Sequence, residues 1–302
     1  MKAAIIRKYG GPEELKYEDF PDPVMGPGQV LVKTCATSIN PIDLKTRSGT
    51  VKDFMPISFP AILGWDVSGT VLAIAGDVNS FSIGDQVFTH ALKTYATVCA
   101  VRADALARVP AGMDLAQVAA LPTVTTTGAQ LADLAVGSSE KQTVLVLGAV
   151  GNVGRSAVYR LKEHSATVIA GVLKRQAAEA KLTGADSVAA LDDDQDIESL
   201  PELDAIADTI NGPTAAKVVR KLKSEGIFAS VLGPPSNAAG RPDMVVKTMQ
   251  VKPDAKTLLD MARAVQSGNL SIPIGESFPL KKAGAAHAAA EGGRKGKILL
   301  LA

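Results

Sequence analysis

The sequence predicts an α/β protein that combines a mostly antiparallel β domain with a doubly wound parallel sheet. Short β-like runs broken by Gly and Pro fill the chain up to about Pro122. After that point, apolar strands alternate with helical stretches, which is typical of βαβ units around a parallel sheet. Hydrophobic residues make up 46% of the chain and charged residues 21%, a balance typical of a globular protein with a sizeable core.

The first part of the chain, residues 1–117, predicts the antiparallel β domain. Its β-like runs include GQVLVKTCATSI, GTVLAIAG and GDQVFTH, and turn signals such as DPVMGPG and FSIGD separate them. Because no long helical period occurs there, we expect strands and turns to dominate this region.

Residues 118–252 predict the parallel-sheet domain. TVLVLG is followed by NVGRSAVYRLKEH, and then by ATVIAG and RQAAEAKLTGA. The near-continuous apolar character of VLVL and TVIA indicates strands that are buried on both faces, as in a sheet covered by helices on both sides.

The last part of the chain, residues 253–302, changes character again. DAKTLLDMARAVQSG predicts an amphipathic helix. SIPIGESFPL follows, then an Ala-rich helix around residues 283–290 and a final strand KILLLA. The apolar set of the first helix is Leu258, Leu259, Met261, Ala262 and Val265.

Composition excludes several classes of function. Lys plus Arg number 32 against 31 Asp plus Glu, so no charge excess favours nucleic acid or an anionic membrane surface. No apolar run approaches the roughly 20 residues that span a bilayer. The two cysteines, Cys35 and Cys99, do not make a disulfide framework and indicate a reducing compartment. We therefore expect a cytoplasmic protein.

The strongest motif is VLVLGAVGNVGRSAV, in which a buried strand meets a glycine-rich turn and a helix. Gly148 permits the tight turn, Gly151 lets the backbone approach a pyrophosphate, and Gly154 lets the helix pack closely on the strand. Asn152 and Val153 begin the helix, whose N-terminus attracts phosphate. The motif predicts a dinucleotide site; a Gly-rich turn without a ligand is the alternative.

The end of the second strand of this domain distinguishes NAD from NADP. An NAD site places a carboxylate there for the ribose 2′-hydroxyl, whereas an NADP site places cations there for the 2′-phosphate. Here TVIAGVL runs into Lys174 and Arg175 with no carboxylate. The pattern predicts NADPH; a solvated helix start is the alternative reading of the two cations.

Three stretches, SINPIDLKTRSG, FPAILGWDVSGTVLAIAGDVNSFSIGDQVF and VLVLGAVGNVG, resemble the zinc-independent quinone oxidoreductases. These zeta-crystallin-like proteins form a branch of the medium-chain dehydrogenases/reductases, and the likeness runs over nearly the whole chain. It implies a GroES-like domain of residues 1–117 completed by 253–302. A Rossmann-type NADP-binding domain of residues 118–252 is inserted between them, and the active site is expected in the interdomain cleft.

The resemblance also implies a site without zinc. Zinc-dependent relatives hold a catalytic zinc through a Cys and a His, and Asn40 and Trp65 stand at those two positions in this chain. Neither an amide nor an indole replaces a thiolate or imidazole as a strong zinc ligand. Two cysteines exclude a four-cysteine zinc lobe. The three histidines, His90, His164 and His287, show no ligand spacing and are expected at the surface or in loops.

Without zinc there is no Lewis acid to polarise an alcohol, so reduction of an electrophilic acceptor suits this site better. Hydride addition to a quinone or to the β-carbon of an enone needs proximity in a dry cleft and a donor near the developing oxyanion. Asn40 is the candidate catalytic donor, and stabilisation of the turn before Pro41 is its alternative role.

The resemblance also implies cofactor and pocket roles for other residues, at positions that match the family. Near the nicotinamide, the resemblance places Thr127 in TTTGAQ, Asn211 in DTING, and Leu232 and Gly233 in SVLGPP. Tyr95 in TYATV lines the substrate pocket or serves packing. The further pocket candidates are Lys45, Phe54 and Trp65.

Two departures from the family widen the range of functions. The family's tyrosines near the N-P-x-D segment are absent, and the loop before Tyr95 is cut to HALK. An enoyl-thioester reductase, with Lys45 and Arg47 as cations for the carrier phosphate, is one alternative. A non-catalytic NADPH-binding structural or regulatory protein is another. The resemblance makes a homodimer the default; the physiological acceptor and the choice between hydride and single-electron transfer stay open.

Overall fold

The computed structural model describes residues 1–136, 141–293 and 295–302. It divides into two compact units. Unit 1 comprises residues 1–123, 253–266 and 272–302, and unit 2 comprises residues 124–252 and 267–271. Among the described residues, no helix is long and apolar enough to cross a membrane.

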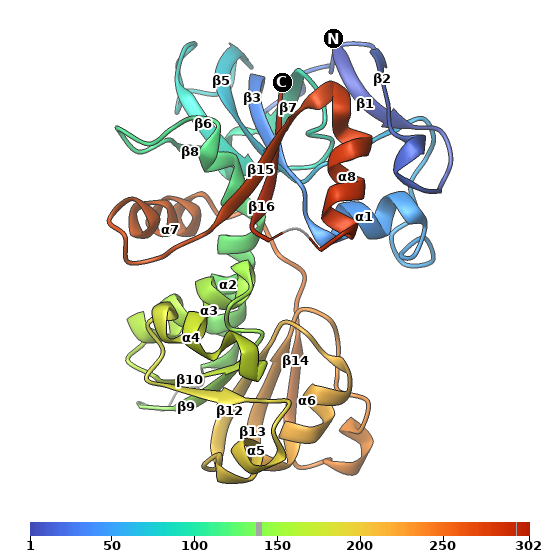
Figure 1. Cartoon of the computed structure of the whole chain (residues 1–302). Coiled ribbons are helices and arrows are strands. Elements are labelled where there is room, and N and C mark those ends of the chain that lie inside the picture. The colour runs from blue at the N-terminus through green and yellow to red at the C-terminus, as the bar shows by residue number, and fades with distance from the viewer. Residues whose placement is uncertain (137–140, 294) are drawn as a thin grey trace. The chain divides into compact units, whose positions relative to one another are not determined.

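Unit 1 is built on two sheets (Figure 1). The larger follows the order β15-β16-β3-β5-β6-β8, with β7 paired to β3, and its pairs are antiparallel except for β15 with β16. The smaller has the order β2-β1-β4 and is antiparallel. The strands are β1 (Lys2–Ile6), β2 (Lys16–Asp19), β3 (Gln29–Ser38), β4 (Ala61–Ile62), β5 (Asp66–Ile74), β6 (Gln86–His90), β7 (Val98–Arg102), β8 (Ala107–Arg108), β15 (Ile274–Pro279) and β16 (Lys297–Leu301).

The register of the larger sheet brings distant parts of the chain to one edge. Strand β16 runs antiparallel to β3 with Leu299 opposite Ser38, so continuing the register sets Lys297 opposite Asn40. On the other side of β3, Ala36 lies opposite Ser68 of β5, and the same continuation sets Asp66 opposite Ser38. The sheet therefore assembles residues that are more than 200 positions apart in sequence.

In the described part of unit 1, the helices are α1 (Pro41–Ser48), α7 (Ala255–Gln266) and α8 (Ala283–Glu291). Helix α7 is the amphipathic helix that the sequence predicts. Leu258, Met261 and Ala262 of its expected apolar set are buried, whereas Leu259 and Val265 are half-buried. A one-sided apolar stripe of this kind covers a core with a single helix face.

Unit 2 is a six-stranded parallel sheet with the order β11-β10-β9-β12-β13-β14. This is the strand order of a doubly wound dinucleotide-binding sheet. Its strands are β9 (Thr143–Leu147), β10 (Thr167–Val172), β11 (Ser187–Ala190), β12 (Leu203–Asp208), β13 (Leu222–Ser230) and β14 (Val245–Thr248). Its helices are α3 (Asn152–Glu163), α4 (Ala177–Ala180), α5 (Asp194–Ser199) and α6 (Gly212–Val218), while α2 (Pro122–Ala135) begins at the end of unit 1.

Alternate residues of the central strand β9 are buried in two different cores. Val144 and Val146 pack with Leu161 of α3, whereas Leu145 and Leu147 pack with Val218 of α6. Helices therefore cover both faces of the sheet, which explains the near-continuous apolar run of VLVL. The α/β fold class that the sequence predicts is confirmed.

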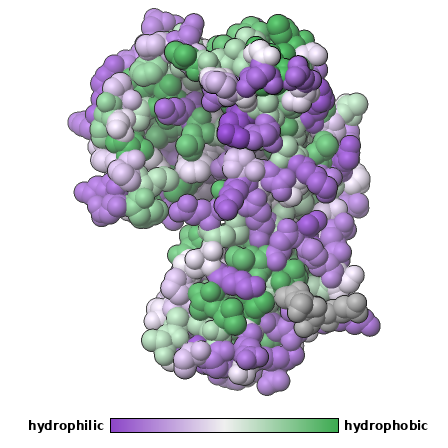
Figure 2. Space-filling model, turned by 180° about the vertical axis from the view of Figure 1, so that it is seen from behind, coloured by the Kyte–Doolittle hydropathy of each residue, from purple (hydrophilic) through white to green (hydrophobic). Residues whose placement is uncertain are grey.

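Short 3-10 turns join these elements. They lie at Pro12–Glu14, Ala103–Ala105, Gln117–Ala120, Lys174–Gln176, Lys181–Thr183, Val219–Lys221, Ala238–Gly240 and Leu280–Lys282. Figure 2 shows hydrophobic side chains gathered on one face of unit 2. The large apolar side chains exposed on this unit are Leu173, Leu182, Ile210, Leu232, Val245 and Val246.

Candidate functional site

Asn40 lies at the junction between β3 and α1. Its extended backbone and the following Pro41 form a typical helix start, because a proline at the first helical position loses no hydrogen bond. The Asp43 carboxylate accepts the Asn40 backbone N–H at 2.9 Å. Burial raises the pKa of Asp43 to about 7, although hydrogen bonds from the Asn40 and Gly64 backbone oppose the shift. The Asn40 side chain also reaches Asp66 of β5 in the sheet.

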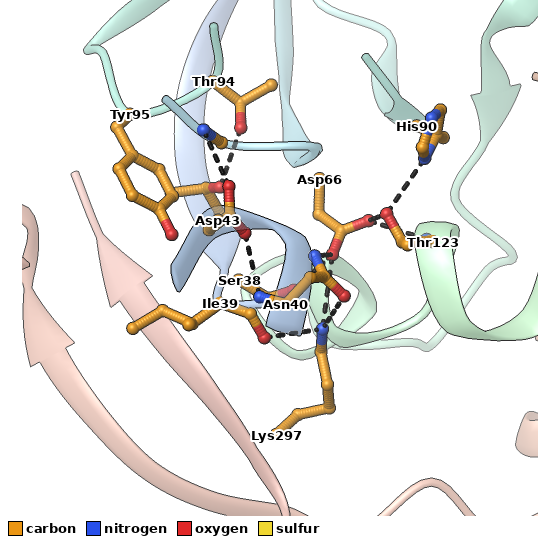
Figure 3. Close-up of polar contacts among 12 residues, drawn as sticks. Ser38, Ile39, Asn40, Asp43, Asp66, His90, Thr94, Tyr95, Thr123 and Lys297 are labelled. Atoms are coloured by element: carbon orange, nitrogen blue, oxygen red, sulfur yellow. Dashed lines mark hydrogen bonds and ion pairs between the residues drawn. The ribbon is translucent and has the colours of Figure 1, made fainter. Parts of the chain in front are cut away.

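Two buried charges hold the Asn40 amide (Figure 3). Its Nδ2 donates to Asp66 Oδ2 at 2.7 Å, and its Oδ1 accepts from Lys297 Nζ at 2.7 Å. Asn40 is 2% exposed, Asp66 is fully buried and Lys297 is 4% exposed. The amide therefore has a single orientation, because a flip would set donor against donor and acceptor against acceptor.

Asp66 is a buried anion stabilised from several sides. Ser38 Oγ and Lys297 Nζ also approach its Oδ2, the latter at 3.4 Å. The backbone N–H and the hydroxyl of Thr123 both donate to Oδ1 at 2.7 Å. Burial alone raises the pKa of Asp66, but the Lys297 charge and these hydrogen bonds outweigh it and lower the pKa. Burial likewise lowers the pKa of Lys297, against the attraction of Asp66 and Asp43.

His90 is linked to the same carboxylate through Thr123. Its Nδ1 lies 2.9 Å from Thr123 Oγ1, and its ring lies 5.2 Å from the half-buried ring of Trp65. Because the Thr123 hydroxyl donates to Asp66, it must accept from His90, which sets the proton of the neutral imidazole on Nδ1. Burial lowers the pKa of His90, and the Asp66 charge opposes that shift.

The expectation that the histidines lie at the surface or in loops is wrong for two of them. His90 ends strand β6 and is 5% exposed, and His287 in α8 is completely buried. His164 is exposed, as expected.

The four predicted pocket residues lie in different environments. Lys45 on α1 and Phe54 are exposed, and Trp65 is half-buried beside His90. Tyr95 is completely buried, and its hydroxyl bonds His287 Nε2 at 3.0 Å. The burial of Tyr95 and its bond to His287 favour the packing role that the sequence left open, and its place in a substrate pocket stays a prediction. Each of these side chains belongs to unit 1.

One cation suggested for a carrier phosphate is not available for it. Arg47 is 1% exposed, and its guanidinium pairs with Glu291 of α8. The Arg47 charge is thus already paired with a carboxylate, whereas Lys45, the other cation of that pair, is exposed.

The glycine-rich loop has the expected geometry in unit 2. Gly148 adopts φ 77°, and a Cβ there would lie 2.6 Å from Thr209 Oγ1. A Cβ on Gly154 would collide with the Gly148 carbonyl oxygen and lie 2.8 Å from Ala149 Cα. Gly151 is the exposed N-cap residue of α3, and half-buried Asn152 and Val153 start the helix. The first turn of α3 thus offers backbone N–H groups and the positive end of the helix dipole to a phosphate.

The two predicted 2′-phosphate cations differ in their surroundings. Lys174 Nζ pairs with Asp193 Oδ2 at 2.9 Å, and the Lys174 backbone N–H donates to Asp192 at 2.7 Å. Arg175 is exposed and forms no ion pair within the described part of the chain. Arg175 is therefore the cation of the two that is free to meet an anionic ligand.

The loops after β12 and β13 contain the remaining predicted cofactor residues. Asn211 adopts φ 52°, and Asp208 at the end of β12 accepts its backbone N–H at 2.8 Å. Leu232 is exposed, and Gly233 adopts φ 109°. Because β10, β9, β12 and β13 are neighbours in the parallel sheet, these loops and the glycine loop share its carboxyl edge. Thr127 lies separately on α2, where it is 8% exposed.

The donor set does not fit a zinc ion. Among the described residues, no group of three or more His, Cys, Asp or Glu is placed to hold a metal. At Asn40, the amide oxygen already accepts from the Lys297 ammonium, and a cation next to Lys297 would be repelled. The Asn40 amide oxygen is therefore occupied by Lys297 and is a poor ligand for a metal ion.

Comparison with known proteins supports one family. A family model described as an alcohol dehydrogenase GroES-like domain matches residues 26–144, and one described as a zinc-binding dehydrogenase matches residues 183–300. A chloroplast envelope quinone oxidoreductase homolog of Arabidopsis thaliana is 30% identical over 99% of this chain and 98% of its own length. An NADPH-dependent alkenal/one oxidoreductase of the same plant is 31% identical over 77% of this chain and 63% of its own length.

The fold comparison gives the same picture. The solved quinone oxidoreductase of Coxiella burnetii has a TM-score of 0.86 and 29% identity, over 100% of this chain and 99% of that chain. Similarity in sequence and in fold therefore extends over both units.

Proposed function

This chain belongs to the quinone oxidoreductase branch of the medium-chain dehydrogenases/reductases, and from that premise we propose that it reduces quinones or α,β-unsaturated carbonyl compounds with NADPH and without zinc. The protein is an oxidoreductase that uses a nicotinamide cofactor. The observation that carries the finer proposal is the Asn40 amide, fixed between Asp66 and Lys297 where zinc-dependent relatives have a metal ligand.

Unit 2 supplies the features that suit NADPH. The glycine loop and the first turn of α3 suit a pyrophosphate, and Asn211, Leu232 and Gly233 lie along the same edge of the sheet. No carboxylate ends β10, and Arg175 beyond it is unpaired within the described residues, which favours a 2′-phosphate over a bare ribose hydroxyl. When bound, the nicotinamide supplies a hydride.

Unit 1 supplies the polar group that the acceptor needs. As the acceptor gains a hydride, negative charge develops on its carbonyl oxygen, and a preorganised N–H donor stabilises that charge. We assign this donor to Asn40 Nδ2, whose orientation the two buried charges fix. The amide is not a proton source, so the proton that completes the reduction comes from another group or from water.

Two further predictions accompany this function. A homodimer is supported by strand β14, which pairs on one side only with β13 among the described residues. The cytoplasmic location stays a prediction from the sequence.

Initial rates test the proposal directly. Purified protein is mixed with NADPH or NADH and with a panel of quinones, enones and enoyl thioesters, and loss of reduced cofactor is followed at its absorbance maximum. The proposal expects turnover that prefers NADPH, with enones or quinones as the better acceptors and no loss of rate after dialysis against a chelator. Preference for enoyl thioesters would overturn the acceptor class, and preference for NADH would overturn the role of Arg175.

A further inference from the structure

The cluster around Asn40 contains a lysine that no motif in the sequence singles out. We propose that Lys297 is a positioning residue that orients and polarises the Asn40 amide, and so strengthens the N–H that meets the acceptor oxygen. The inference rests on the proposed function, because it concerns how the same site stabilises the acceptor.

Counting donors and acceptors shows that Lys297 does not itself bind the acceptor. An ammonium has three N–H donors. Lys297 points them at the Ile39 carbonyl at 3.0 Å, at Asn40 Oδ1 at 2.7 Å and at Asp66 at 3.4 Å. All three are used, and the group is 4% exposed, so any effect of Lys297 passes through a neighbour.

Asp66 is equally occupied. Its two oxygens receive Ser38 Oγ, Asn40 Nδ2 and Lys297 Nζ on one side and two Thr123 donors on the other. A carboxylate offers about four lone-pair sites, so five donors saturate it. Asp66 therefore acts as the anion that anchors the amide and does not act on a substrate.

One hydrogen of the Asn40 amide has no partner within the cluster. The Asn40 Nδ2 amino group has two hydrogens, and one of them is donated to Asp66. The second has no acceptor in the part of the chain that the structure describes. With the carbonyl end on a cation, the amide is polarised toward its nitrogen, and the remaining N–H becomes a stronger donor. Lys297 thus sets both the direction and the strength of the one donor that is left.

The test compares Lys297→Met with its neighbour Lys295→Met, an exposed lysine two residues earlier in the chain. Each variant is assayed with an enone and with a quinone, and NADPH affinity and thermal unfolding are measured alongside. Oxyanion-type donors are worth about 10²–10³-fold in kcat, so weakening one through Lys297 should cost about 10- to 100-fold with the enone. We expect a smaller loss with the quinone, whose product anion is delocalised, and no loss in Lys295→Met.

A double-variant comparison separates polarisation from simple support of the fold. Lys297→Met is introduced into Asn40→Ala. If Lys297 acts through Asn40, it adds no further loss of kcat in that background, whereas independent effects multiply. Lys297→Arg keeps the positive charge in a larger group and should lose less kcat than the about 10-fold expected at least for Lys297→Met, which also serves if the Met variant fails to fold.

Three results overturn the inference: unchanged kcat in folded Lys297→Met, equal losses with both acceptors that follow lost thermal stability, or multiplicative losses in the double variant. Failure of the wild-type protein to reduce any acceptor while binding NADPH would instead overturn the proposed function itself.

Discussion

His287 is buried against Tyr95 and near the Arg47 charge, and this placement makes unit 1 sensitive to acid. Burial, and then Arg47, lower the pKa of His287 from 6.5 to about 3. In the unfolded chain, His287 therefore binds a proton as the pH falls below 6.5. In the folded chain, it stays neutral until about pH 3. The free energy of unfolding is therefore unaffected by the titration of His287 above pH 6.5. It decreases as the pH falls toward 3, with a slope of about 1.4 kcal/mol per pH unit.

The variant His287→Gln removes that titration. We expect a flatter dependence of the free energy of unfolding on pH between 6.5 and 3, measured by urea denaturation at several pH values. An unchanged slope in His287→Gln would contradict the burial argument.

Cofactor choice also depends on single residues. Arg175 is unpaired within the described residues, whereas Lys174 is paired with Asp193. Arg175→Ala should raise the KM for NADPH about 10-fold or more and leave the KM for NADH nearly unchanged, because a charged hydrogen bond to the 2′-phosphate is worth about 1.5–3 kcal/mol. Lys174→Ala should have the smaller effect. Equal losses with NADPH and NADH in Arg175→Ala would contradict its assignment to the 2′-phosphate.

The sequence indicates Asn40 as a candidate donor but not the groups that hold it. Asp66 follows Trp65 directly, so the GWD motif was a usable signal for one of them. Lys297 and Thr123 gave no such signal, because their hydrogen bonds to Asp66 span 231 and 57 positions and depend on how distant elements pack together. The burial of Tyr95 was not predictable either, because a motif position does not reveal burial.

At the scale of elements, the start of α3 is where sequence and geometry agree most closely. Gly154 has no room for a side chain against the backbone of residues 148 and 149, whereas a Cβ on Gly151 would meet only the Gly148 oxygen, at 3.2 Å. These two glycines therefore have separable roles. Gly154 allows the helix to pack on the sheet, and Gly151 gives a phosphate access to the backbone.

The variants Gly154→Ala and Gly151→Ala separate the two roles. Overpacking against backbone atoms should make Gly154→Ala less stable by about 1–3 kcal/mol and weaken NADPH binding as a consequence. Gly151→Ala should unfold near the wild-type temperature and still bind NADPH more weakly. Thermal unfolding and cofactor titration are measured on both. Normal NADPH affinity in Gly151→Ala would contradict a phosphate site at this loop.

Strand types were predictable from the apolar runs, but pairing was not. VLVL indicates a strand buried on both faces, and β9 is one. That β16 pairs with β3 rather than with β1 is decided by long-range packing, which a local pattern does not contain. The placement of Lys297 in the cluster depends on that pairing.

At the scale of the whole molecule, the exposed strand β14 at one edge of the unit 2 sheet predicts a homodimer. Val245 and Val246 on β14 are 42% and 38% exposed, and β14 has an unpaired edge within the described residues. Unpaired, apolar strand edges favour pairing with another copy. We expect a dimer in solution that Val246→Lys converts toward monomer, measured by light scattering after gel filtration. The exposed Val24→Lys in unit 1 is the control, and a monomeric wild-type protein would contradict this assembly.

The proposed activity is hydride transfer from NADPH to an electrophilic carbonyl compound. The most direct test uses NADPH carrying deuterium at nicotinamide C4, each epimer in turn, with a simple enone, and locates the label in the product by NMR. We predict that one epimer delivers deuterium to the β-carbon of the saturated ketone, and that this transfer persists after chelation but falls sharply in Asn40→Ala. Oxidation of NADPH without deuterium in the product, or transfer that requires added zinc, would contradict this claim.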